Sequence, residues 1–131
     1  MNKKNEELLL NIENLHVHFI SKDETVKALN GVNLKVVKGR TIGIVGETGA
    51  GKTTTALAVL NMIQKPQGKV VQGKITLNDI EILNKTDREM EEIRGNLVSM
   101  IFQDPMTALN PVFTVGEQIA ESIMIHEHLK K

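Results

Sequence analysis

The segment GETGAGKT, at residues 46–53, is the most informative stretch of this sequence. It matches the pattern G-x-x-x-x-G-K-[ST], in which glycines let backbone N–H groups point inward around a phosphate. It follows the apolar run Thr41–Val45 and precedes a helical pattern, which is the context that this motif requires. The alternative is a glycine-rich turn beside a solvated lysine, and spacing together with context favours a phosphate-binding loop.

Each position of this loop suits the binding of a triphosphate. The backbone and the start of the following helix supply N–H donors and the positive end of a helix dipole. The side chain of Lys52 is expected to reach the terminal phosphates, and the hydroxyl of Thr53 is expected to ligate Mg2+. The predicted nucleotide-binding residues are Gly46, Glu47, Thr48, Gly49, Ala50, Gly51, Lys52, Thr53 and Thr54.

Alternating patterns on both sides of the loop predict an antiparallel sheet. Apolar and polar residues alternate, with one slip, over Leu10–Phe19 and again over Val32–Val36, which is typical of half-buried strands. A tight hairpin is predicted where Asn78-Asp79 separates the short apolar segments Lys74–Leu77 and Ile80–Leu83.

Two other segments, Thr41–Val45 and Leu97–Phe102, are apolar without alternation. Such runs predict strands of a parallel sheet that is buried on both faces. The first of them leads through the glycine-rich loop into a helix, so the overall expectation is an α/β fold.

Three helices are predicted. The first follows the loop, and Pro66 and Gly68 are expected to end it. Its apolar face is expected to comprise Ala56, Val59, Leu60 and Ile63. The second opens with a capping box at Thr86 and Glu89 and stops at Gly95, and the third covers roughly residues 115–129.

Composition excludes several classes of function. The 131 residues contain no cysteine, tryptophan or tyrosine, and 16 basic side chains balance 16 acidic ones. Disulfide scaffolds and Cys-ligated metal sites are excluded, and neither a basic nucleic-acid-binding face nor a base-stacking surface is expected. No signal peptide or spanning segment is evident, so the chain is expected to be cytoplasmic and to act at a membrane only through a protein partner.

The segment MIFQDPMTALNP, at residues 100–111, carries a specific resemblance. Together with residues 36–39 and 43–46 it resembles the ATP-binding subunits of ATP-binding-cassette (ABC) transporters, and strongly those that serve dipeptide, oligopeptide and nickel import. The resemblance implies an α/β fold, with a RecA-like P-loop NTPase core and an antiparallel β subdomain. It implies residues 1–103 as the β subdomain and core, and residues 104–131 as the glutamine loop and the start of a helical subdomain.

The resemblance also implies function and partners. It implies a subunit that binds ATP and Mg2+ and, in complete form, hydrolyses ATP to drive import. The partners implied are integral membrane permease subunits, a second ATP-binding subunit and, indirectly, an extracytoplasmic substrate-binding protein. No nucleic acid is implied. The subunit would lie on the inner face of the cell membrane.

Two site residues outside the loop come from the resemblance. Gln103 corresponds to a family glutamine that contacts Mg2+ and lies near the attacking water, so it joins Lys52 as a predicted catalytic residue. From composition alone Gln103 would be a polar strand end before the turn at Asp104-Pro105. Phe19 is either the aromatic residue that stacks on adenine or a residue of the core, and both interpretations stay open.

Several family motifs do not occur in this sequence. These are a signature resembling L-S-G-G-Q, the acidic strand motif and the switch histidine, all of which follow the glutamine loop in the family. The chain is therefore expected to be the N-terminal half of a cassette, with apolar surface and a strand edge left open. The alternatives are a non-catalytic nucleotide-binding fragment and a small P-loop phosphotransferase.

Overall fold

The computed structural model describes residues 7–104 and 108–127. They form two compact units, Met1–Lys85 and Thr86–Lys131, which are described separately below.

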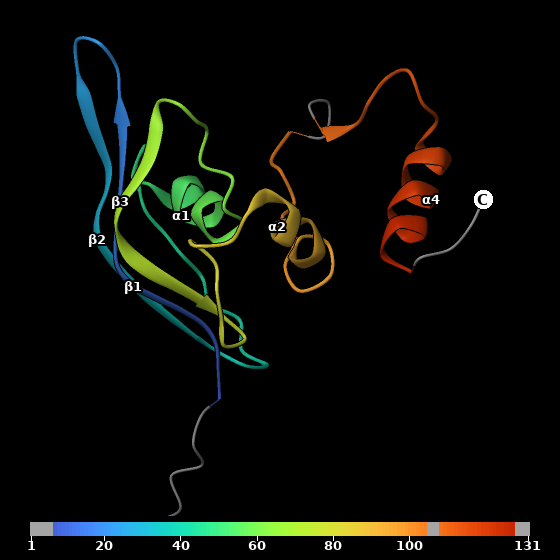
Figure 1. Cartoon of the computed structure of the whole chain (residues 1–131), viewed down its shortest axis with the longest axis horizontal. Helices are drawn as coiled ribbons and strands as arrows, with labels where there is room; N and C mark the ends of the chain where they lie inside the picture. Colours follow the sequence, from blue (N-terminus) through green and yellow to red (C-terminus); the bar gives the residue numbers. More distant parts are fainter. Residues whose placement is uncertain (1–6, 105–107, 128–131) are drawn as a thin grey trace, which may run out of the picture. The chain divides into compact units, whose positions relative to one another are not determined.

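The first unit is built on a four-stranded antiparallel sheet with the strand order β2-β1-β3-β4 (Figure 1). Its strands are β1 (Leu8–Ile20), β2 (Thr25–Val37), β3 (Gly68–Leu77) and β4 (Ile80–Glu81). The two alternating segments and the hairpin predicted from the sequence are confirmed. The turn of the hairpin has φ values of 46° at Asn78 and 65° at Asp79, both in the left-handed region that two-residue hairpin turns require.

The slip in the alternation of β1 is a β-bulge. The register of β1 against β2 shifts between Ile12 and Leu15, and Asn14 between them has a φ of 47°. The N–H of Asn14 donates to Oδ1 of Asn33 across the bulge, at 2.9 Å. Because one extra residue is accommodated there, Ile12, Leu15 and Val17 are all buried despite their uneven spacing.

Helix α1 (Lys52–Val59) packs beside the sheet and is shorter than the sequence predicts. The predicted stop at Pro66 and Gly68 is wrong. Asn61 has a φ of 51°, and its N–H donates to the carbonyl of Ala58 at 3.0 Å. The N–H of Met62 donates to the carbonyl of Leu57 at 2.8 Å, which completes a Schellman motif with asparagine in the left-handed position.

The face that α1 buries is also shifted from the predicted one. Thr55, Ala58 and Val59 are buried, whereas Ala56 is exposed. Leu60 and Ile63 are buried as predicted, although both lie beyond the end of the helix. The other buried apolar residues of this unit are Ile12, Leu15, Val17, Leu29, Ile75, Leu77 and Ile82.

The two expected strands of a parallel sheet are not found, and this corrects the sequence prediction. Residues 41–47 have no regular structure, and residues 97–102 contain only an isolated bridge from Val98 to Arg94. Val45 and Ile101 are 93% and 98% exposed. A strand exists only through the ladder with its neighbour, and the described residues provide no ladder for either segment.

The second unit contains α2 (Asp87–Ile93) and α4 (Val115–His126). The predicted capping box of α2 is confirmed, because the Thr86 side chain accepts from the N–H of Glu89 and the Glu89 side chain accepts from the N–H of Thr86. Helix α4 opens with the same arrangement, formed by Thr114 and Glu117. Its start agrees with the predicted helix, whose last residues lie outside the described part of the chain.

Candidate phosphate-binding site

The predicted phosphate-binding loop connects the irregular residues 41–45 to α1. A turn in which the N–H of Ala50 donates to the carbonyl of Glu47, at 3.2 Å, folds its centre. Gly49 and Gly51 have φ values of 84° and 83°, which residues with a side chain adopt only at a cost. The backbone path of the loop therefore requires glycine at positions 49 and 51.

Gly51 also fixes the loop against the sheet. A Cβ atom at this position would lie 2.5 Å from Cδ2 of Leu29 and 2.8 Å from the carbonyl oxygen of Ala28, both in β2. Nothing lies within 4 Å of a Cβ placed on Gly49. The end of the loop therefore rests directly on β2, while its middle is open to solvent.

The N-terminus of α1 is open to a ligand. Gly51 is its N-cap, and no side chain caps the helix there. The first turn contains no acidic residue. Because the first N–H groups of a helix have no partner within the helix, they are available to an anion, and the helix dipole favours negative charge at this end.

Lys52 places its ammonium group inside the loop. Its Nζ donates to the carbonyl oxygens of Gly46 and Glu47, at 2.6 and 2.7 Å. A lysine ammonium has three donors, so one remains for an oxygen of a bound phosphate. The two carbonyls thus hold the positive charge at the loop without neutralising it.

The three threonines after Lys52 differ in their surroundings. Thr53 is exposed and Thr54 is half-buried. Thr55 is 7% exposed, and its Oγ1 donates to the carbonyl of Gly51 at 2.9 Å. Thr53 can therefore offer its hydroxyl to a ligand, whereas Thr55 holds the end of the loop in place. Thr55 is not among the residues predicted from the sequence, although threonine often forms this bond to the carbonyl four residues earlier.

The two remaining predicted site residues belong to other segments of the chain. Phe19 is in β1, is half-buried and pairs with Gly68 of β3. Its Cε1 would lie 3.0 Å from a Cβ placed on Gly68, so the ring lies over that glycine. Gln103 is an exposed residue of the second unit. The adenine-stacking role of Phe19 and the Mg2+ and water roles of Gln103 stay predictions.

Within residues 7–104 and 108–127, no three His, Cys, Asp or Glu residues are grouped so that they could hold a metal ion. In the same residues, none of the helices has the length and apolar character needed to cross a bilayer.

A family model described as ABC transporter matches residues 29–131. The chain is 45% identical over 123 residues to the oligopeptide transport ATP-binding protein AppD of Bacillus subtilis, covering 94% of this chain and 38% of that protein. It is 43% identical over 124 residues to the glutathione import ATP-binding protein GsiA of Salmonella typhimurium, covering 91% of this chain and 20% of that protein.

A solved structure shares the fold. The ATP-binding cassette MJ0796, in a dimeric post-hydrolysis state bound to ADP and Pi, superposes with a TM-score of 0.75 at 21% identity. The match covers 93% of this chain and 50% of that one. The predicted fold class, an α/β nucleotide-binding cassette with an antiparallel sheet, is therefore confirmed.

Proposed function

Because the chain belongs to the ABC transporter family, we propose that it is part of the ATP-binding subunit of an importer and that residues 46–54 bind the phosphates of ATP. The observation that carries the proposal is the position of the Lys52 ammonium, held by two loop carbonyls beside the uncapped start of α1. Positive charge and free N–H donors then face the same ligand, which is the arrangement that a polyphosphate needs.

The residues present also fit the Mg2+ that accompanies ATP. The exposed hydroxyl of Thr53 is an oxygen ligand of the kind that Mg2+ accepts, and it follows directly after Lys52. A bound Mg2+ would supply charge neutralisation at the phosphates. Gln103 would offer its amide oxygen to the ion or to the attacking water, so Lys52 and Gln103 are the proposed catalytic residues. Phe19 is the proposed platform for adenine.

The cargo that we propose is a peptide. This rests on the relatives, which are named for oligopeptide transport and for glutathione import. Nickel remains the alternative cargo. We further propose that permease subunits hold the protein at the inner face of the membrane, that a second ATP-binding subunit completes the site, and that an extracytoplasmic binding protein delivers the cargo.

The proposed division places residues 1–103 in the β subdomain and core, and residues 104–131 in the glutamine loop and the start of the helical subdomain. The chain spans 38% of the length of AppD, so the activity of a whole subunit goes beyond what this part contains. The second function that we propose, for these 131 residues without the rest of a subunit, is to bind ATP without hydrolysing it. A small P-loop phosphotransferase is the third, and the family match counts against it.

The experiment that tests the proposal is calorimetry of Mg-ATP binding, with phosphate release measured on the same 131-residue chain. Lys52→Ala is expected to weaken binding by about 2 kcal/mol or more, which is roughly 30-fold. Lys38→Ala is the matched control, because Lys38 pairs with Glu7 at 3.0 Å and is not part of the loop. If a folded Lys52→Ala variant bound Mg-ATP as tightly as the parent chain, the loop would not be the phosphate-binding site.

A further inference from the structure

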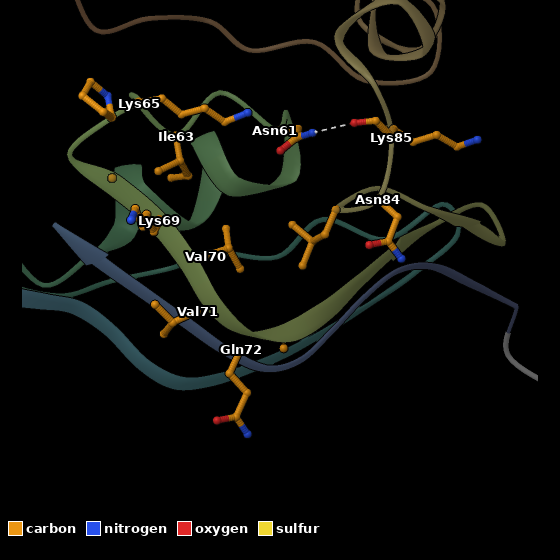
Figure 2. A pocket seen from close by; sticks show the side chains of 13 residues that line it. Asn61, Ile63, Lys65, Lys69, Val70, Val71, Gln72, Asn84 and Lys85 are labelled. Atoms are coloured by element: carbon orange, nitrogen blue, oxygen red, sulfur yellow. Dashed lines mark hydrogen bonds between the residues drawn. The ribbon is translucent and has the colours of Figure 1, made fainter. Parts of the chain in front are cut away.

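A groove of about 660 Å³ runs along β3 in the first unit (Figure 2). One wall comes from the residues that follow α1, including Asn61 and Lys65, and the other comes from residues 83–85. Its base is the first part of β3, residues 68–73. None of residues 46–54 lines it, so this groove is distinct from the phosphate-binding loop.

The base of the groove is an open strand edge. β1 pairs with β3 from Leu77 back to Gly68, but β4 pairs only with Thr76 and Leu77 on the other edge. The N–H of Ile82 adds one bond, to the carbonyl of Ile75 at 2.9 Å. Within the described part of the chain, no strand continues along residues 69–73 on that edge. Such an edge offers backbone donors and acceptors to an added strand.

The groove is positively charged. Lys65, Lys69 and Lys85 line it, and none of the aspartates and glutamates among the described residues does. In Figure 2 Lys65 and Lys69 lie near the start of β3, whereas the side chain of Lys85 points away from them, so the three do not converge on one centre. This spacing suits a ligand that carries negative charges at intervals, rather than a single compact anion.

The groove also has an apolar side. Figure 2 shows Ile63 and Val70 between the segment after α1 and β3, and Val70 is half-buried. Side chains of a strand alternate between two faces, so an added strand could place apolar residues near Val70 and acidic residues near the lysines. A second copy of this chain would bring lysines against lysines at the same edge, which disfavours self-pairing.

We propose that an extended acidic segment of a partner protein binds in this groove by adding a strand to β3 beside residues 69–73. Backbone hydrogen bonds to the open edge give the segment its orientation. The lysines select acidic residues at alternate positions, and Val70 selects an apolar residue between them.

The test uses the peptide ETEVET labelled with fluorescein, and fluorescence anisotropy with the whole 131-residue chain at low ionic strength. Lys69→Glu is expected to weaken binding by about fivefold or more. Lys27→Glu is the matched control, because Lys27 and Lys69 both lie opposite His18 but Lys27 is in β2 and does not line the groove. The control is expected to change the affinity by less than about twofold.

Two further peptides separate strand addition from general charge attraction. KTKVKT reverses the charge, and ETEVET with alternate amides N-methylated loses the hydrogen bonds of one edge. Neither is expected to bind. Equal binding of the methylated peptide, equal weakening by both lysine variants, or no binding of ETEVET would overturn the proposal. Dimerisation in sedimentation experiments that Lys69→Glu abolishes would instead assign the edge to a second copy.

Discussion

The antiparallel sheet and residues 41–45 are close in sequence and both contain large apolar residues, yet these side chains have different surroundings. In the sheet, Leu15 and Ile75 are completely buried. In residues 41–45, Ile42, Ile44 and Val45 are 43%, 51% and 93% exposed. Strands β1 and β2 are joined by a short turn, whereas a parallel strand depends on a partner reached through a long crossover. Burial among the described residues therefore depends on whether a segment pairs with a neighbouring strand, which is near in sequence for β1 and β2 and distant for β1 and β3.

The largest effect is expected from removing side-chain volume from the sheet. Ile75→Ala should lower the free energy of unfolding by about 2–5 kcal/mol, because Ile75 is 0% exposed and its loss leaves a cavity. Val45→Ala should change it by less than about 0.5 kcal/mol. Urea unfolding followed by circular dichroism measures both. Similar losses for the two variants would mean that Val45 is buried in solution.

A second pair of variants compares the two glycines of the loop that have a positive φ, one packed against β2 and one open to solvent. Gly51→Ala should lower the free energy of unfolding by about 2–4 kcal/mol. The new Cβ would meet Leu29 and Ala28, and the alanine backbone would have to adopt a positive φ. Gly49→Ala has the positive φ alone and should cost about 1 kcal/mol. Thermal unfolding of both variants tests the difference. Equal losses of stability in the two variants would show that the contact of residue 51 with β2 does not contribute to stability.

The bond from Thr55 to the loop should have a smaller effect. Thr55→Val keeps the shape of the side chain and removes its 2.9 Å bond to the carbonyl of Gly51, which still accepts from the N–H of Thr55 at 2.8 Å, so the cost should be about 1 kcal/mol. Thr53→Val is the control, because Thr53 is exposed, and its stability should be unchanged. If both variants unfolded at the same urea concentration as the parent chain, Thr55 would have no role in holding the loop.

The smallest effect concerns pH and the second unit. The backbone N–H and the hydroxyl of Thr114 both donate to Glu117, and they hold the pKa of this carboxyl below its ordinary value of 4.5. A lowered pKa in the folded state stabilises α4 above pH 4.5, and this contribution is lost as the pH falls through the folded value. Glu117→Gln should remove this acid dependence of α4 helicity, measured by NMR, whereas Thr114→Ala keeps the backbone N–H donor and should only reduce it. An unchanged pH profile would contradict the capping role.

Much of the local structure could be predicted from sequence because its determinants are local. The hairpin at Asn78-Asp79 and the capping box at Thr86 depend on residues within a few positions of each other. The end of α1 could not be predicted in the same way, because an asparagine in the left-handed conformation competed with the more obvious signal at Pro66. Apolar runs reveal a tendency to be buried, but burial itself depends on distant partners.

In the candidate site, too, some features depend on residues that are near in sequence and others depend on distant partners. The loop motif and the predicted role of Lys52 in it come from spacing and sequence context, and the contacts of Lys52 are compatible with a phosphate site. The sequence could not reveal that Gly51 touches Leu29 or that Thr55 holds the carbonyl of Gly51, because both depend on how the helix meets the sheet. Gln103 and Phe19 depend on family resemblance and remain predictions.

The contact between Gly51 and β2 couples the motion of the loop to that of the sheet. A ligand that orders the loop must also restrict the motion of Leu29 and Ala28, since the loop cannot shift without displacing them. Binding at the loop would then slow amide hydrogen exchange around Ala28 and Leu29 in β2, while β4, at the opposite side of the sheet, would exchange as before. The sheet would thus report nucleotide occupancy through residues that never touch the nucleotide.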